Sequence, residues 1–283
     1  MPELSEFWVF LFVGFFAQLI DGALGMGYGV ISSVVLLASG VPPAHTSASV
    51  HSAKLFTTAA SGTSHLLHGN VDRRLFWLLS LAGGAGGIGG ALLLTQVPGN
   101  VIRPYVFGYL LLMGLLILWR CVREGRERHL LPGSFVGPLG GVGGFLDAVG
   151  GGGWGPVVTS SLIGVGARPR LVVGTVNAAE FVVTCAVVAA FATTLLAGAW
   201  SEGEGLLDHL LPIAGLVLGG LPAAAVAGLL VKRAPRKAMT FAVALLVIAL
   251  SSYELLRMND VFAARSAAPQ TTTTTPALAG MAK

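Results

Sequence analysis

Ionisable and polar side chains lie at helical spacing on one face of the apolar segment 44–68. They are Ser47, His51, Lys54, Thr58 and Ser61, and the apolar segment 169–200 carries the counterparts Asn177, Glu180 and Thr184. A charged group near the centre of a bilayer costs at least about 2.5–3.5 kcal/mol, so it needs a partner or a task. Lys54 and Glu180 could form an ion pair that only supports the fold. Lys54 could instead attract an anion and Glu180 handle a proton, while His51 either contacts that anion or only packs.

Two glycine-rich stretches, 21–29 and 147–155, could form a binding site for an anion. Glycines leave backbone N–H groups uncovered, and a half-helix that starts beside them presents the positive end of its dipole. The candidate binding residues are Asp21, Gly22, Gly25, Gly27, Tyr28, Asp147, Gly151, Gly153 and Trp154, joined by His51, Lys54 and Asn177 from the polar faces. The alternative is that the glycines only let helices cross closely.

Asp21 and Asp147 precede the glycines at equivalent places. Either could bind a coupling proton or cation, as Glu180 could, or orient the stretch that follows. Either could equally cap the N–H groups of the next half-helix, and the residues alone leave these roles open. The two cysteines, Cys121 and Cys185, have no metal-ligand spacing, so neither a metal site nor a cofactor is expected.

The polar faces and glycine stretches belong to an internal repeat. Adding 126 to residues 14–57 aligns them with 140–183 without a gap, and further along the offset becomes 133. The matched positions include Asp21 with Asp147, Tyr28 with Trp154, Lys54 with Glu180, Gly87 with Gly220, and Arg103 with Arg236. The chain therefore divides into halves 1–120 and 133–257, joined by the charged linker 121–132. Residues 258–283, with a run of five threonines, are expected to form a disordered tail.

The composition excludes a soluble protein. Of 283 residues, 54% are hydrophobic and 11% are charged, against about 25% charged in a soluble domain. The 40 glycines suit transmembrane helices, because small residues let their backbones approach closely. The apolar segments are 7–39, 44–68, 75–96, 101–119, 133–165, 169–200, 207–231 and 238–256. No basic run with interleaved aromatics occurs, so the expected surroundings are a lipid bilayer and not nucleic acid.

The first segment of each half, 7–39 or 133–165, is too long for one span. Its 33 residues would measure about 50 Å against a bilayer core of about 30 Å. Divided at the glycines, each piece would have about 14 residues, or about 21 Å, which is too short to cross. Each segment is therefore either one tilted, broken span or a re-entrant hairpin that leaves by the face it entered.

The basic residues favour the hairpin. Two full spans would leave them almost evenly divided between the faces. With hairpins, one face carries Arg73, Arg74, Arg120, Arg123, Arg126, Arg128, Arg168, Arg170, Lys232, Arg233, Arg236 and Lys237, and the other carries Arg103, Arg257, Arg265 and Lys283. That asymmetry obeys the positive-inside rule. The sequence thus predicts an all-α polytopic membrane protein of two inverted-topology repeats, each a re-entrant broken-helix hairpin plus three transmembrane helices. The linker is then cytoplasmic, and both termini and the tail are extracytoplasmic.

The two glycine stretches with their flanks resemble the TauE/SafE family of sulfite and organosulfonate transporters. The resemblance is strongest over residues 18–29 and 144–156, and the proline turns at 40–43 and 166–169 add to it. It runs over nearly the whole chain to about residue 257. Membership would imply export or uptake of small sulfur-containing anions across a plasma membrane.

We therefore expect a multi-pass protein of the plasma (inner) membrane that acts as a secondary transporter. It would move a sulfite-class or organosulfonate-class anion by alternating access, coupled to protons or another cation. An anion channel lined by the same glycines is the alternative. No hydrolase or metalloprotease motif is present, so an enzyme is not expected. The sequence leaves a monomer and a homo-oligomer both open.

Overall fold

The described part of the chain is entirely helical in its regular elements. The computed structural model describes residues 2–122, 133–200, 210–226, 229 and 235–267. The helices are α1 (Pro2–Leu24), α2 (Tyr28–Ala38), α3 (Pro43–Leu67), α4 (Arg73–Gln96), α5 (Gly99–Val122), α6 (Gly133–Gly150), the π-helical turn η1 (Gly155–Thr159), α7 (Ser160–Gly164), α8 (Pro169–Leu196), α9 (Leu210–Ala225) and α11 (Arg236–Ala267). The predicted all-α class is confirmed.

Local sequence explains where the central helices begin. Pro43 and Pro169 stand at the first position of α3 and α8, where a missing N–H costs nothing and the fixed φ suits the helix. Asp72 caps α4, because its Oδ1 accepts a hydrogen bond from the Leu75 N–H at 2.9 Å. The two helices that carry the polar faces, α3 and α8, therefore begin at matched prolines in the two halves.

The long first segment of each half is broken at the glycines, as predicted. The segment separates into α1 and α2 in the first half, and into α6 and η1–α7 in the second. The expected piece length of about 14 residues is wrong for α1 and α6, which have 23 and 18 residues, or about 35 and 27 Å. In the first half the helix includes the polar turn before Phe7, starting at Pro2. The second pieces stay too short to cross, since α2 has 11 residues.

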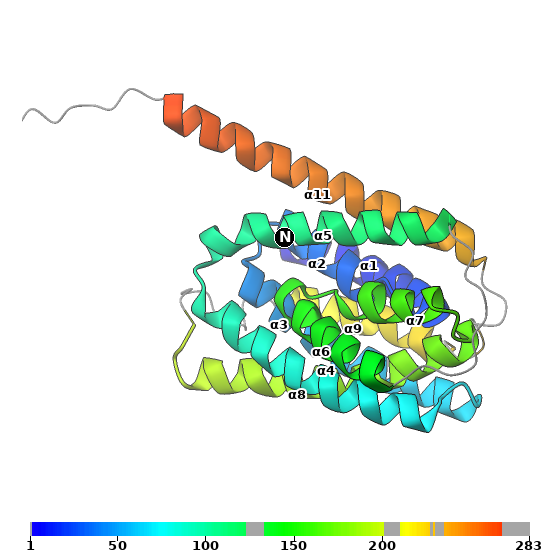
Figure 1. Cartoon of the computed structure of the whole chain (residues 1–283). Helices are drawn as coiled ribbons and strands as arrows, with labels where there is room; N and C mark the ends of the chain where they lie inside the picture. Colours follow the sequence, from blue (N-terminus) through cyan, green and yellow to red (C-terminus); the bar gives the residue numbers. More distant parts are fainter. Residues whose placement is uncertain (1, 123–132, 201–209, 227–228, 230–234, 268–283) are drawn as a thin grey trace, which may run out of the picture.

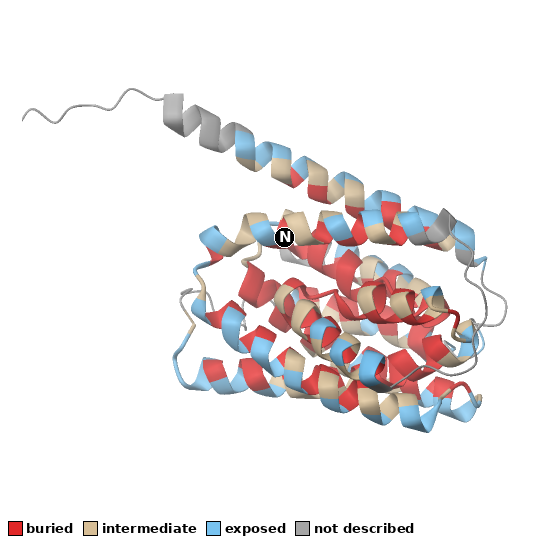
Figure 2. Cartoon of the chain, viewed as in Figure 1, coloured by how far each residue is buried: buried red, intermediate tan, exposed pale blue. Residues whose placement is uncertain are grey.

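Five described helices are long and apolar enough to cross a membrane by length and composition. They contain Phe7–Leu24, Arg73–Gln96, Gly99–Trp119, Pro169–Leu196 and Lys237–Asn259. Large apolar side chains such as Trp8, Phe12, Trp77, Leu112 and Phe241 are exposed on them. Figure 2 shows the buried residues gathered inside the bundle and exposed ones along the outer faces. This distribution suits a bundle surrounded by lipid.

The two halves interlock through matched helix pairs. Helix α4 packs on α6 as α9 packs on α1, and α3 packs on α8 while α5 packs on α11. At the α4–α6 contact, a β-carbon added to Gly86 would collide with the Gly141 carbonyl oxygen. In Figure 1 the long helices lie side by side, with α2, η1 and α7 among them. The core therefore lies between the halves, and each half completes the other.

The last helix continues past the end expected for the second half. Helix α11 runs to Ala267, so the first ten residues of the expected tail, 258–267, are part of this helix. Figure 1 shows this helix extending away from the bundle. The sequence did not predict that the helix continues after Arg257, because apolar periodicity indicates where a helix is buried and not where it ends. Residues 268–283 lie outside the described part of the chain.

Two glycines of α4 give a test of the interlocked packing. Gly86→Ala should lower the melting temperature in detergent, because overpacking typically costs about 1–3 kcal/mol and the obstacle is a backbone carbonyl. The control is Gly89→Ala on the same helix, where the nearest atom to the added carbon is 4.0 Å away in Phe145. The control should melt at or above the parental temperature, since alanine is the better helix former. Equal melting of the two variants would contradict the contact.

Candidate functional site

The two glycine-rich tips have the same backbone design. Gly25 and Gly151 both adopt a φ of 69°, a left-handed conformation that glycine accepts without strain. The Tyr28 N–H donates to Asp21 Oδ1 at 3.3 Å, and the Trp154 N–H donates to Asp147 Oδ1 at 3.1 Å. Each aspartate thus holds the start of the next half-helix, which is the capping role left open by the sequence.

The tips cross each other at the centre of the molecule. A β-carbon on Gly29 would collide with the Gly151 carbonyl oxygen, and one on Gly155 would lie 2.5 Å from Met26 Cα. All of residues 21–34 and 150–156 are buried. The expected close approach of helices at the glycines is therefore real, and it joins the two halves backbone to backbone.

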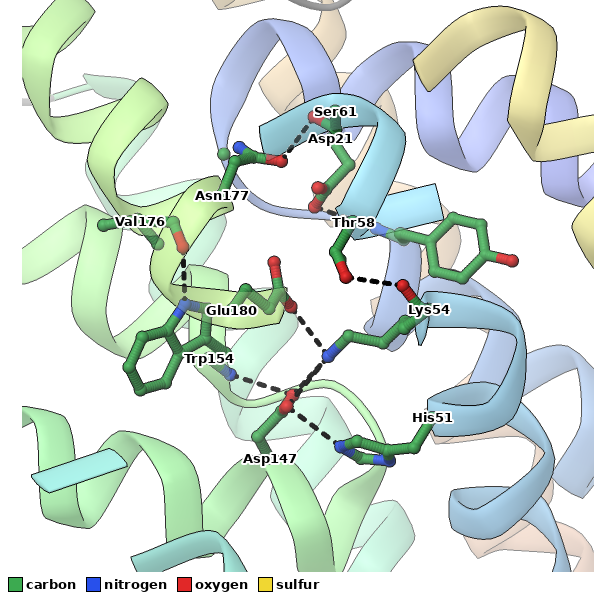
Figure 3. Close-up of polar contacts among 12 residues, drawn as sticks. Asp21, His51, Lys54, Thr58, Ser61, Asp147, Trp154, Val176, Asn177 and Glu180 are labelled. Carbon is green, nitrogen blue, oxygen red and sulfur yellow. Dashed lines mark hydrogen bonds and ion pairs between the residues drawn. The ribbon is translucent and has the colours of Figure 1, made fainter. Parts of the chain in front are cut away.

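A buried ion cluster lies against the second tip. Lys54 Nζ is 2.7 Å from Glu180 Oε1 and 2.8 Å from Asp147 Oδ2. The ion pair predicted between Lys54 and Glu180 is present. Figure 3 shows Lys54 reaching from α3 between Glu180 of α8 and Asp147 of the tip. The Lys54 side chain is 1% exposed, so little water shares in stabilising its charge.

His51 belongs to the same cluster. Its Nε2 is 3.0 Å from Asp147 Oδ2, and its Nδ1 is 2.8 Å from the Ser47 carbonyl oxygen one turn earlier. His51 therefore links the backbone of α3 to the carboxylate of Asp147, which is also in contact with Lys54.

A third carboxylate, that of Asp21, lies near the cluster. It matches Asp147 in the repeat and interacts electrostatically with both Lys54 and Glu180. Three carboxylates with one lysine leave a net charge of −2 when all are ionised and His51 is neutral. Lys54 is consequently saturated by carboxylates and is no free attractor for an anion.

The remaining candidates have mainly structural contacts. Asn177 Oδ1 accepts from Ser61 Oγ at 2.9 Å, which ties α8 to α3. The Trp154 indole N–H donates to the Val176 carbonyl at 3.1 Å, and Tyr28 Oη donates to the Leu216 carbonyl at 3.2 Å. Gly22 lies beside His65, whose Nδ1 is 3.2 Å from the side-chain nitrogen of Asn70.

Two tip glycines are needed for the geometry itself. Gly27 has a φ of 134°, where other residues are strained, and the nearest side chains are those of Ile20 and Ile31. A β-carbon on Gly153 would collide with the Tyr109 hydroxyl and lie 2.7 Å from the Asp147 nitrogen. Substitution at either glycine would therefore distort the tip whether or not a ligand binds there.

The sequence did not identify two hydroxyl groups at the second tip, those of Ser33 and Tyr109. A β-carbon on Gly151 would collide with Ser33 Oγ, as one on Gly153 would with Tyr109 Oη. The available signal was the repeat itself, which matches Ser33 with the polar Thr159. Across the described residues, no three His, Cys, Asp or Glu side chains are arranged to hold a metal ion.

The fold and the buried cluster define a multi-pass α-helical membrane transporter. The family described as Sulfite exporter TauE/SafE matches residues 10–281. The probable membrane transporter protein YtnM of Bacillus subtilis (strain 168) is 43% identical over 231 residues, which cover 80% of this chain and 74% of that protein. The probable membrane transporter protein ORF9 of Sinorhizobium sp. is 36% identical over 95 residues, 33% of this chain and 36% of its own. The chain belongs to the TauE/SafE family.

The shared lysine predicts an order of stabilities. Lys54→Met leaves two buried carboxylates without their partner, and breaking a buried pair costs about 3–5 kcal/mol in soluble interiors. Glu180→Gln should cost much less, because Asp147 still neutralises Lys54 and the amide oxygen still accepts its hydrogen bond. The triple variant Lys54→Met, Asp147→Asn, Glu180→Gln should recover much of the loss. Melting temperatures decide this, and equal losses from Lys54→Met and Glu180→Gln would contradict the shared pairing.

Proposed function

We propose that the protein is a secondary active transporter for a small sulfur-containing anion of the sulfite or organosulfonate class. The substrate would bind where the two glycine-rich tips meet, and protons or another cation would move with it. The single observation that carries this proposal is the buried cluster of Lys54, Asp147 and Glu180 beside the crossing tips. A membrane protein that needed only a stable core would gain little from ionisable groups at such depth.

The charge of the cluster supports coupling to a cation. With all three carboxylates ionised and His51 neutral, an anion would enter beside a net charge of −2 and be repelled, since two like charges about 4 Å apart cost about 4 kcal/mol at an effective dielectric constant of about 20. Protons on Glu180 and Asp21 would bring that charge to zero. Protonation of Glu180 would also release Lys54 from one of its two carboxylates, so the lysine could then stabilise the substrate. In this proposal Glu180 and Asp21 take the coupling ion, and Asp147 keeps Lys54 and His51 in place.

Helix directions support the re-entrant hairpin of the second half. Contacts of α4 with α6 rise together along both chains, from Leu79 near Gly140 to Gly90 near Phe145. Contacts of α4 with α8 do the same, from Gly83 near Val183 to Gly87 near Val187. Helices α6 and α8 therefore run in the same direction, so η1 and α7 return between them. This direction favours the proposed hairpin over a continued span.

An inverted arrangement of the halves has similar support. Helices α3 and α8 occupy matched places in the repeat, yet Lys54 contacts Glu180 while Ser61 contacts Asn177. The residue numbers rise on α3 as they fall on α8, so the two helices are antiparallel. Matched helices that run in opposite directions are what an inverted repeat requires. We therefore propose that the second half enters the membrane from the opposite face.

Cysteine labelling tests the proposed topology. In a background without Cys121 and Cys185, single cysteines at positions 2 and 42 should react with a membrane-impermeant maleimide added outside cells. Cysteines at 72 and 168 should react only after permeabilisation, because they would lie on the basic, cytoplasmic face. Reaction of positions 2 and 42 from opposite faces would exclude the hairpin.

Flux into proteoliposomes tests the transport cycle. With an imposed pH gradient, the unmodified protein should accumulate labelled sulfite or methanesulfonate above its equilibrium level. Glu180→Gln should abolish that accumulation while keeping most of the thermal stability, because the variant cannot release the proposed coupling proton. If the unmodified protein only lets the anion reach equal concentrations on both sides, the anion-channel alternative would be favoured over a transporter. If the Glu180→Gln variant accumulates the labelled anion to the same level as the unmodified protein, Glu180 does not carry the coupling proton.

A further inference from the structure

The two tips share a backbone but have different side-chain surroundings. Ser33 approaches Gly151 of the second tip, and Thr159, its match in the repeat, approaches Gly25 of the first. Thr159 Oγ1 donates to the Gly25 carbonyl oxygen at 2.7 Å, so this hydroxyl is already bonded within the protein. No such hydrogen bond forms from Ser33 Oγ among the described residues.

Tyr109 adds a second hydroxyl at the same tip. Its Oη is close to Gly153 and is buried, and within the described part of the chain it too has no hydrogen-bond partner. At the offset of 133 that relates α5 to α11, the matching residue is Ala242. The second tip therefore has two unsatisfied donors of hydrogen bonds, whereas the hydroxyl of Thr159 at the first tip is satisfied.

Unsatisfied hydroxyls in a fully buried place cost free energy that a protein usually avoids. The Ser33 side chain is 0% exposed, so bulk water does not compensate it. A hydroxyl group can donate a hydrogen bond to an oxygen atom that carries negative charge. The oxygen atoms of a sulfite or sulfonate group are acceptors of this kind. Asp147 caps the same tip, and its contact with Lys54 makes the local charge less negative.

We propose that the transported anion binds at the second tip only, with its oxygen atoms accepting hydrogen bonds from Ser33 Oγ and Tyr109 Oη. The first tip, with Asp21, is left to the coupling ion. This assignment rests on the proposed function and deepens it, because it gives the two matched tips different ligands.

Two conservative variants test the assignment through opposite effects on stability and affinity. In Ser33→Ala and Tyr109→Phe, the melting temperature without ligand should stay level or rise, because an unsatisfied hydroxyl is removed. The affinity for sulfite and for methanesulfonate, measured from ligand-induced shifts in melting temperature, should fall about tenfold or more in each variant. The double variant should lose the ligand-induced shift.

The control is Ser251→Ala in α11, which removes another buried hydroxyl without a partner among the described residues. It should keep the parental affinity. If the unmodified protein binds either anion and both variants bind equally well, the second-tip site is wrong while the proposed function stands. If neither anion shifts the unmodified protein, the proposed substrate class and the site both fail. A marked loss of ligand-free stability in both variants would show that the hydroxyls serve the fold, and would also overturn the assignment.

Discussion

The structure depends on one lysine shared between two carboxylates at a place that water does not reach. Lys54 comes from the first half, and both of its partners, Asp147 and Glu180, come from the second. The desolvation of these charges is offset only while all three keep their geometry. The cluster therefore fixes how α3, α8 and the second tip stand to one another. The cluster also couples the charges of Asp147 and Glu180, because protonation of one carboxylate strengthens the interaction of Lys54 with the other.

The repeat duplicates the backbone and differentiates the side chains. The matched positions 54 and 180 lie in contact, so identical charges there would repel each other. A lysine at 54 and a glutamate at 180 avoid this repulsion. Asp21 and Asp147 stay identical, because each caps its own half-helix, but of the two it is Asp147 that forms the ion pair with Lys54 within the described residues. One scaffold thus provides two electrostatically different places.

The sequence predicted features that follow from the repeat and from helical spacing. The breaks near Gly25 and Gly151, the polar faces and the Lys54–Glu180 pair are of this kind. It did not predict that Asp147 would join Lys54 across 93 residues, because that contact depends on how the halves interlock. Ser33 and Tyr109 were missed for a similar reason: a lone hydroxyl in an apolar helix has no pattern of its own. The lengths of α1 and α11 were underestimated, since polar ends leave the apolar period but remain helical.

Backbone packing constrains which parts can move during transport. The tips meet at glycines with no side chain between them, and a dense contact of this kind has little room for sliding. The ion cluster is different, because its contacts change strength when a carboxylate is protonated. If the proposed alternating access occurs, we expect α3 to move relative to α8 around tips that stay joined. In the proposed cycle, protonation of Glu180 would both weaken its contact with Lys54 and compensate the charge of the bound anion. The two helices would then loosen when the site is occupied.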